Sequence, residues 1–212
     1  MENDLIQIIA GWEHNPQDFS KNVRQIRGID GREKIQLRTE LGLSQMELEG
    51  RPDGKRPAGF PSVLDWVCHR MREHRQRGLP PEVFRLDDAD VERLQRESLQ
   101  YQLRGACLLA MENREKAIRN IEHTIAITRL LSCHAPDEET RTQHRQLVPH
   151  LLLERTRVKV VFHVSQGDAT EAAREIVEQI QREDREGRAN ASPSLTALQE
   201  MAEEVRRKYL AR

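Results

Sequence analysis

The chain has 212 residues, with 34 Lys and Arg residues against 35 Asp and Glu residues and a formal net charge of -1. That length suits one domain, or one domain with a small appendage, because a single hydrophobic core serves up to roughly 250 residues. Charged residues make up 33% and aromatic residues only 4%, which favours amphipathic helices over a β-sandwich or β-barrel. The near-zero net charge argues against bulk electrostatic capture of nucleic acid.

Targeting features and cysteine usage predict a cytoplasmic protein without a membrane partner. The longest apolar run, residues 106–111, has six residues, whereas about 20 are needed to cross a bilayer. The acidic first residues lack the basic region and long apolar run of a signal peptide. The three cysteines, Cys68, Cys107 and Cys133, are odd in number and far apart, so we expect no disulfide framework.

Residues 33–49 alternate between apolar and polar side chains. The odd positions from 35 to 43 are apolar or Thr, and the even positions from 34 to 40 are charged or polar, as in a half-buried strand. The alternation shifts by one position before Met46 and Leu48, which suggests a bulge or a short break near Ser44. We therefore predict a strand over 33–49, with one helix over 31–49 as the alternative.

A second run, residues 20–28, precedes this strand. The Asp30-Gly31 pair between the two runs is typical of a hairpin turn, because both residues tolerate a positive φ. A short helix over residues 2–12 precedes the hairpin. The segment from Gln36 to Gly54 also resembles one found in uncharacterised bacterial proteins, a resemblance that implies no function.

Residues 51–77 are locally basic, with seven basic and three acidic side chains. The turn-rich loop at the start of this segment carries Arg51, Lys55 and Arg56 as candidate residues for binding phosphates or an acidic peptide. The alternative is a solvated helix face whose charge is offset by the acidic stretch beyond it.

From residue 61 onward the apolar spacing becomes helical. We predict a helix that ends at Gly78, a linker at Leu79-Pro80-Pro81, and a long helix from Asp87 or Asp88 to about Met111. Asn113 then breaks the helical pattern. The predicted fold is α+β and mostly α, with an N-terminal β-hairpin unit over 1–57, a basic helix over 58–78, and an antiparallel helical stack over 79–212.

The stack contains a repeated pattern. Gly105 precedes Ala117 and Ile121, and the turn at Gly167-Asp168 precedes Ala172 and Ile176 in the same way. Residues 88–185 thereby resemble a tetratricopeptide (TPR) array, in which small residues allow a close crossing of paired helices. The resemblance implies an antiparallel stack of helical hairpins.

Two features depart from the TPR pattern. Val160 stands in the second unit where the first has Gly105, and Ala117 and Ala172 are 55 positions apart, whereas TPR units repeat about every 34 residues. The second unit also resembles, more faintly, the UVR helical hairpin of nucleotide-excision repair proteins.

Ser192-Pro193 starts a last helix that we expect to cap the stack.

No pattern in the chain predicts a reaction, a cofactor or a metal site. The Cys-His neighbours Cys68-His69 and Cys133-His134 point about 100° apart on a helix, and no Cys-x2-Cys pair supplies further ligands. No Gly-x-Ser-x-Gly nucleophile motif and no phosphate-binding glycine loop are present in the sequence. We therefore expect a protein that is not an enzyme.

The TPR resemblance implies a ligand along the first helix of each hairpin. There Gln102, Ala106 and Leu109 correspond to Arg157, Val161 and Val164. Arg157 is suited to gripping a carboxylate as a bidentate fork, with Glu154 one turn earlier to orient it. The alternative is that so short a stack has too small a groove and buries these faces under the terminal helix.

These observations favour a non-enzymatic interaction or scaffold protein that binds another protein, a peptide or its own copy. The alternative function is a nucleic-acid-associated accessory protein that uses the basic segment 51–77.

Overall fold

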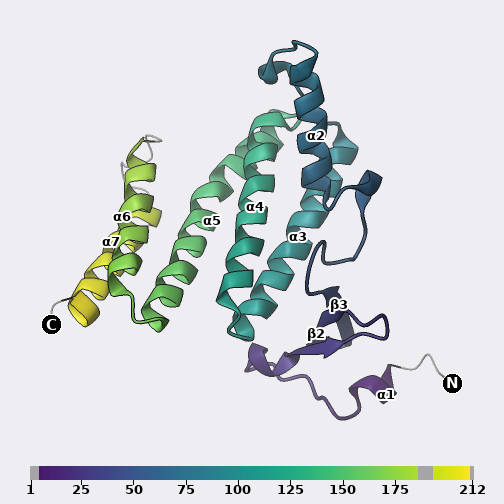
Figure 1. Cartoon of the computed structure of the whole chain (residues 1–212), viewed down its shortest axis with the longest axis vertical. Helices are drawn as coiled ribbons and strands as arrows, with labels where there is room; N and C mark the ends of the chain where they lie inside the picture. Colours follow the sequence, from purple (N-terminus) through teal and green to yellow (C-terminus); the bar gives the residue numbers. More distant parts are fainter. Residues whose placement is uncertain (1–4, 186–192, 211–212) are drawn as a thin grey trace.

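A computed structural model describes residues 5–185 and 193–210 of the chain (Figure 1). Most of these residues are helical, and a small antiparallel sheet lies near the N-terminus, which confirms the predicted α+β, mostly α fold class. In Figure 1 the helices α3, α4 and α5 stand side by side, the sheet lies at the lower end of α3 and α4, and α6 and α7 lie beyond α5.

The N-terminal unit is a three-stranded sheet in the order β1-β2-β3. Strand β1 (Val23–Arg27) pairs with β2 (Glu33–Thr39), and the Asp30-Gly31 turn joins them, with Gly31 at φ +76°. This hairpin confirms the predicted turn. A single helical turn, α1 (Ile6–Ile9), precedes the sheet inside the predicted range 2–12.

The prediction of one strand over 33–49 was wrong. The chain turns at residues 40–41, and β3 (Gly42–Glu47) pairs back onto β2, with Thr39 opposite Gly42 and Ile35 opposite Met46. The side chains that face the helices are at odd positions in β2, such as Ile35, and at even positions in β3, such as Met46, because a two-residue turn separates the strands. This turn accounts for the shift in alternation that suggested a bulge near Ser44. The helix over 31–49 is excluded.

One face of the sheet packs on the helices α3 (Asp88–Ala110) and α4 (Arg114–His134). This interface is a continuous apolar cluster of seven buried residues, Ile35, Leu37, Met46, Leu48, Cys107, Leu108 and Ala117. The β-unit therefore shares a hydrophobic core with the end of α3 and the start of α4.

Helix starts coincide with capping side chains. Helix α2 (Val63–Gln76) begins after Ser62, whose side chain accepts a hydrogen bond from the backbone of Asp65. Asp87 caps α3 and Asn113 caps α4 in the same way. The predicted helix starts near Asp87 and Asn113 are therefore confirmed, and α2 ends at Gln76, within two residues of the predicted stop at Gly78, which has φ +75°.

The second half of the stack comprises α5 (Glu138–Ser165), α6 (Ala169–Arg185) and α7 (Pro193–Val205), followed by one π-helical turn (Arg206–Leu210). Helix α7 packs on α5 and α6 through an apolar cluster that includes fully buried Leu198. The predicted cap at Ser192 lies outside the described residues. None of the helices in the described ranges combines the length and the apolar content of a membrane span.

Candidate partner-binding face

Helices α3 and α5 flank α4 and display exposed apolar side chains along a series of grooves. Leu99 and Leu109 on α3 are 66% and 38% exposed, and Leu147 and Val161 on α5 are 48% and 51% exposed. Because large apolar side chains are usually buried, a row of them beside grooves is typical of an interaction surface. We call this surface the α3–α5 face.

The first groove runs between α3 and α5 over α4 and has a volume of about 340 Å³. Leu99 and Gln102 line it from α3, and Leu147 and Leu151 line it from α5. The Gln102 side chain donates a hydrogen bond to Ser98 Oγ at 3.1 Å, which orients the amide along the groove wall. The predicted residue Gln102 therefore lies on the α3–α5 face.

Two further grooves continue along α5. The smaller one, of about 160 Å³, lies between Leu109 on α3 and Val158 on α5. The larger one, of about 620 Å³, lies between α5 and α7. Arg157 and Val161 line both of them, so these two grooves meet at Arg157.

The groove between α5 and α7 has an apolar lining and a charged margin. Its charged members are Arg157, Glu200 and Glu204, and its apolar members are Val160, Val161, Val164, Ala197, Met201, Val205 and Tyr209. Arg157 Nη1 lies 2.9 Å from Glu154 Oε1, and the two side chains are about half exposed, at 49% and 56%. The predicted pair of Arg157 and Glu154 is thus formed at the edge of this groove.

The terminal helix covers part of the predicted face and leaves part of it open. Val160 and Val164 belong to the apolar cluster between α5, α6 and α7, whereas Val161 stays half exposed. The alternative of a face buried under the terminal helix therefore holds in part for Val164, which is half-buried against that cluster and still lines the groove, but not for Val161 or Arg157.

The other predicted residues lie elsewhere, in the loop between β3 and α2. The Arg51 side chain is only 9% exposed, with its Nε 3.4 Å from Glu97 Oε2 and 3.1 Å from Asp53 Oδ1. Lys55 and Arg56 are exposed, and Arg56 Nη2 donates to the carbonyl oxygen of Gly59 at 3.0 Å. Arg51 is therefore engaged within the fold, and Lys55 and Arg56 remain at the surface.

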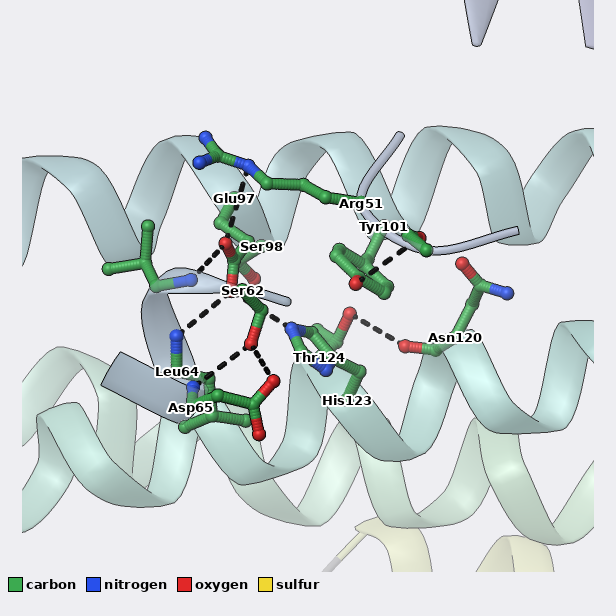
Figure 2. A network of polar contacts seen from close by, with 12 residues as sticks. Arg51, Ser62, Leu64, Asp65, Glu97, Ser98, Tyr101, Asn120, His123 and Thr124 are labelled. Carbon is green, nitrogen blue, oxygen red and sulfur yellow. Dashed lines mark hydrogen bonds and ion pairs between the residues drawn. The ribbon is translucent and has the colours of Figure 1, made fainter. Parts of the chain in front are cut away.

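Glu97 is the centre of a buried polar network that sequence reasoning missed (Figure 2). Its carboxylate accepts hydrogen bonds from the backbone N–H groups of Val63, at 2.7 Å, and Leu64, at 3.1 Å. Glu97 Oε1 also pairs with His123 Nε2 at 3.0 Å, and the His123 ring stacks on Tyr101 with centroids 3.7 Å apart. The signal in the sequence was that Glu97 is an acidic residue on the otherwise apolar side of α3, three positions after Leu94 and four before Tyr101.

The loop after β3 is tied to the same part of α3. Buried Arg104 donates to the carbonyl oxygens of Gly50, at 2.7 Å, and Glu47, at 2.9 Å, and to Asn120 Oδ1, at 2.9 Å. Burial lowers the pKa of the Arg104 guanidinium. These bonds, together with those of Glu97, join the N-terminal unit, α2, α3 and α4 into a single structure.

The histidines and cysteines singled out in the sequence do not converge on one site. His74 contacts the carbonyl oxygen of Pro80, His134 that of Phe84, and His144 that of Thr140, while His69 pairs with Glu73 and His123 with Glu97. Burial raises the pKa of the Cys107 thiol to about 11 and also raises that of Cys68. The three thiols are free.

Comparisons with known proteins do not indicate a function for the chain, so its function has to be inferred from this geometry. No family model, no curated protein and no solved structure matches the chain.

Proposed function

We propose that the chain is a non-enzymatic interaction or scaffold protein, whose TPR-like helical stack binds a peptide segment of another protein along the α3–α5 face. The observation that carries the proposal is the row of exposed Leu99, Leu147 and Val161 beside grooves. An amphipathic helix of a partner buries its own apolar stripe in such a groove, with anchors three or four residues apart.

The charges at the groove favour a partner segment that carries both signs. Arg157 is suited to a carboxylate, since a guanidinium binds one through two parallel hydrogen bonds. Glu200, on the opposite wall, is suited to a Lys or Arg of the partner. These contacts at the margin would fix the direction of the segment, while the apolar lining supplies most of the affinity.

The arrangement of the buried carboxylates supports the absence of an enzymatic role. Glu97 binds two backbone N–H groups, and Asp90 binds Arg70 at 2.6 Å and Arg93 at 3.2 Å. The oxygens of both carboxylates therefore hold elements of the fold together.

We further propose a cytoplasmic location, because the free thiol of Cys133 is exposed and suits a reducing compartment.

The test compares two valines of equal exposure. Val161 is 51% exposed on the α3–α5 face, and Val177 is 49% exposed on α6 and does not line the described grooves. Tagged wild type, Val161→Asp and Val177→Asp are used for affinity capture from the native cell, followed by mass spectrometry. We expect Val161→Asp to lose at least about tenfold of the specific partner, since a buried charge at an interface core costs several kcal/mol.

Two outcomes would discard this face. Equal recovery of partners by both valine variants is one, and unchanged recovery by Arg157→Glu combined with Leu147→Asp is the other. Sedimentation of the same variants distinguishes a second copy of the chain from a different protein, because self-association through this face is lost in Val161→Asp.

The alternative of nucleic-acid binding depends on the basic segment 51–77. Arg51 and Arg70 are paired with the buried carboxylates of Glu97 and Asp90, so five exposed basic residues remain for phosphates, namely Lys55, Arg56, Arg72, Arg75 and Arg77. A gel-shift titration with salt tests this alternative, because binding through several phosphates weakens steeply as salt rises. Absence of any shift at low salt would eliminate it.

A further inference from the structure

Three metal-ligating side chains meet across the turn between α5 and α6. His163 lies in the last turn of α5, and Glu171 and Glu175 lie one turn apart at the start of α6. One ligand atom from each of the three lies within 4.8 Å of the others, and all three residues are half-buried. We call them the α5–α6 triad.

The turn itself holds the triad in place. Gly167 has φ +80°, and the backbone N–H of Asp168 donates to the carbonyl oxygen of His163 at 2.9 Å. Asp168 Oδ1 in turn accepts the backbone N–H of Glu171 at 2.9 Å and caps α6. Because the spacing of four residues puts Glu171 and Glu175 on one side of α6, both carboxylates face the end of α5.

The existing contacts leave donor atoms of the triad available. In the described part of the chain, neither ring nitrogen of His163 makes a hydrogen bond; its ring has an edge contact with Phe162. Glu175 Oε1 pairs with Lys159 Nζ at 2.9 Å, and Glu171 Oε1 pairs with Arg174. A half-buried imidazole without a hydrogen-bond partner, beside two carboxylates on another helix, distinguishes this group from an ordinary surface ion pair.

We propose that the α5–α6 triad binds one Zn²⁺ ion. An imidazole nitrogen and carboxylate oxygens bind zinc at about 2.0–2.2 Å, which puts neighbouring donors about 3.3–3.6 Å apart on a tetrahedral ion. The donors of the triad reach that spacing from 4.8 Å by rotation of the two flexible Glu side chains. Two carboxylates neutralise the ion, and water takes the fourth position.

Lys159 competes with the metal ion for the carboxylate of Glu175. Its ammonium group neutralises Glu175 in the absence of an ion and must be displaced when Zn²⁺ binds. The ion then ties the last turn of α5 to the first two turns of α6. This site is independent of the α3–α5 face, so either proposal can fail without the other.

The experiment is a calorimetric titration of the purified, chelator-treated full chain with Zn²⁺ alone, with Co²⁺ absorption as a second readout. We expect one ion per chain, and a loss of affinity of at least about tenfold in both His163→Ala and Glu175→Gln. Lys159→Gln should bind more tightly than wild type. His69→Ala is the matched control, because His69 and Glu73 form a helical pair, at 3.5 Å, without a third ligand.

Circular dichroism of each variant establishes that it is folded, and Glu175→Gln keeps the shape of the side chain if His163→Ala fails to fold. Absence of Zn²⁺ binding by wild type overturns the proposal. Binding that survives His163→Ala and Glu175→Gln but is lost in His69→Ala also overturns it, because the ion would then lie on α2.

Discussion

The carboxylate of Glu97 accepts a hydrogen bond from the backbone N–H of Val63 at 2.7 Å, so α3 supplies an acceptor to the first turn of α2. The first N–H groups of a helix have no partner inside it, and the positive end of the helix dipole favours a carboxylate. Glu97 is fully buried, and its carboxylate also contacts Arg51 and His123. Through these contacts Glu97 connects α3 to the start of α2 and to α4, which are far apart in the sequence.

Replacement of Glu97 by Ala should lower the free energy of unfolding by roughly 3–5 kcal/mol. The change removes the acceptor of the backbone N–H groups of Val63 and Leu64 and one of the two carboxylates that pair with the largely buried Arg51, which is the costly case for a buried ion pair. Urea denaturation followed by circular dichroism measures the loss. Glu92→Ala is the control, since Glu92 is exposed on the same helix and its pair with Arg96 contributes less than about 1 kcal/mol. Equal losses in both variants would contradict the role of Glu97.

Alanine should have opposite effects at two glycines. Gly105 lies inside α3, where an added Cβ meets the Cβ of Asn120 at 3.5 Å, an ordinary contact, so Gly105→Ala should be neutral or stabilise by up to about 1 kcal/mol. Gly167 has φ +80° in open space, so Gly167→Ala should destabilise by about 1–2 kcal/mol through its backbone alone. The same urea denaturation compares them, and a loss at Gly105 would show that the crossing of α3 and α4 tolerates no added methyl group.

The three thiols should differ in their rate of alkylation. Burial raises the pKa of Cys107 to about 11, so only roughly one molecule in a thousand carries the reactive thiolate at pH 8. Cys133 is exposed and should react first with iodoacetamide, with Cys68 next and Cys107 last. Peptide mass spectrometry over a time course measures the order, and in urea all three should react alike. Early modification of native Cys107 would mean that the sheet separates readily from α3.

The Asp30 carboxyl should titrate well below its usual range. A hydrogen bond from Lys34 is the largest cause of its lowered pKa, and the backbone N–H of Arg32 adds to it. Because the pKa is depressed in the folded chain, this contact stabilises the fold above the unfolded pKa and is lost as pH falls through the folded value. Carbon NMR of the carboxyl groups measures the titration. Lys34→Gln should move the pKa of Asp30 upward, whereas Lys21→Gln should leave it unchanged.

Local features of the sequence were sufficient for most of the secondary structure. Ser62, Asp87 and Asn113 accept hydrogen bonds from the first turns of α2, α3 and α4, so each helix start depends on residues within four positions. The turn at residues 40–41 escaped prediction because Leu41 continues the apolar alternation although it is 95% exposed at the tip of the hairpin. Periodicity reports side-chain polarity and does not detect a reversal of the chain.

The candidate face was predicted in part. The TPR resemblance implied a ligand along the first helix of each hairpin, at Gln102, Glu154 and Arg157, and the structure brings Gln102 and Arg157 to grooves along one face. The charge count of segment 51–77 made Arg51 a candidate for binding phosphates or an acidic peptide, because such a count cannot include a carboxylate from another helix. The α5–α6 triad was missed for a similar reason, although the spacing of Glu171 and Glu175 after His163 was visible across the turn.

The sequence alone determined the charge balance, the helix limits and the hairpin at Asp30-Gly31, because these depend on composition, backbone conformation and hydrogen bonds over a few residues. Only the tertiary structure decided which charges are free. Arg51 and Arg70 are neutralised by the buried carboxylates of Glu97 and Asp90. Some of the 34 basic and 35 acidic residues therefore offset one another inside the fold and are not free charges at the surface. Such pairing depends on which helices pack together, and a buried charge is stable only when its partner arrives from a neighbouring element.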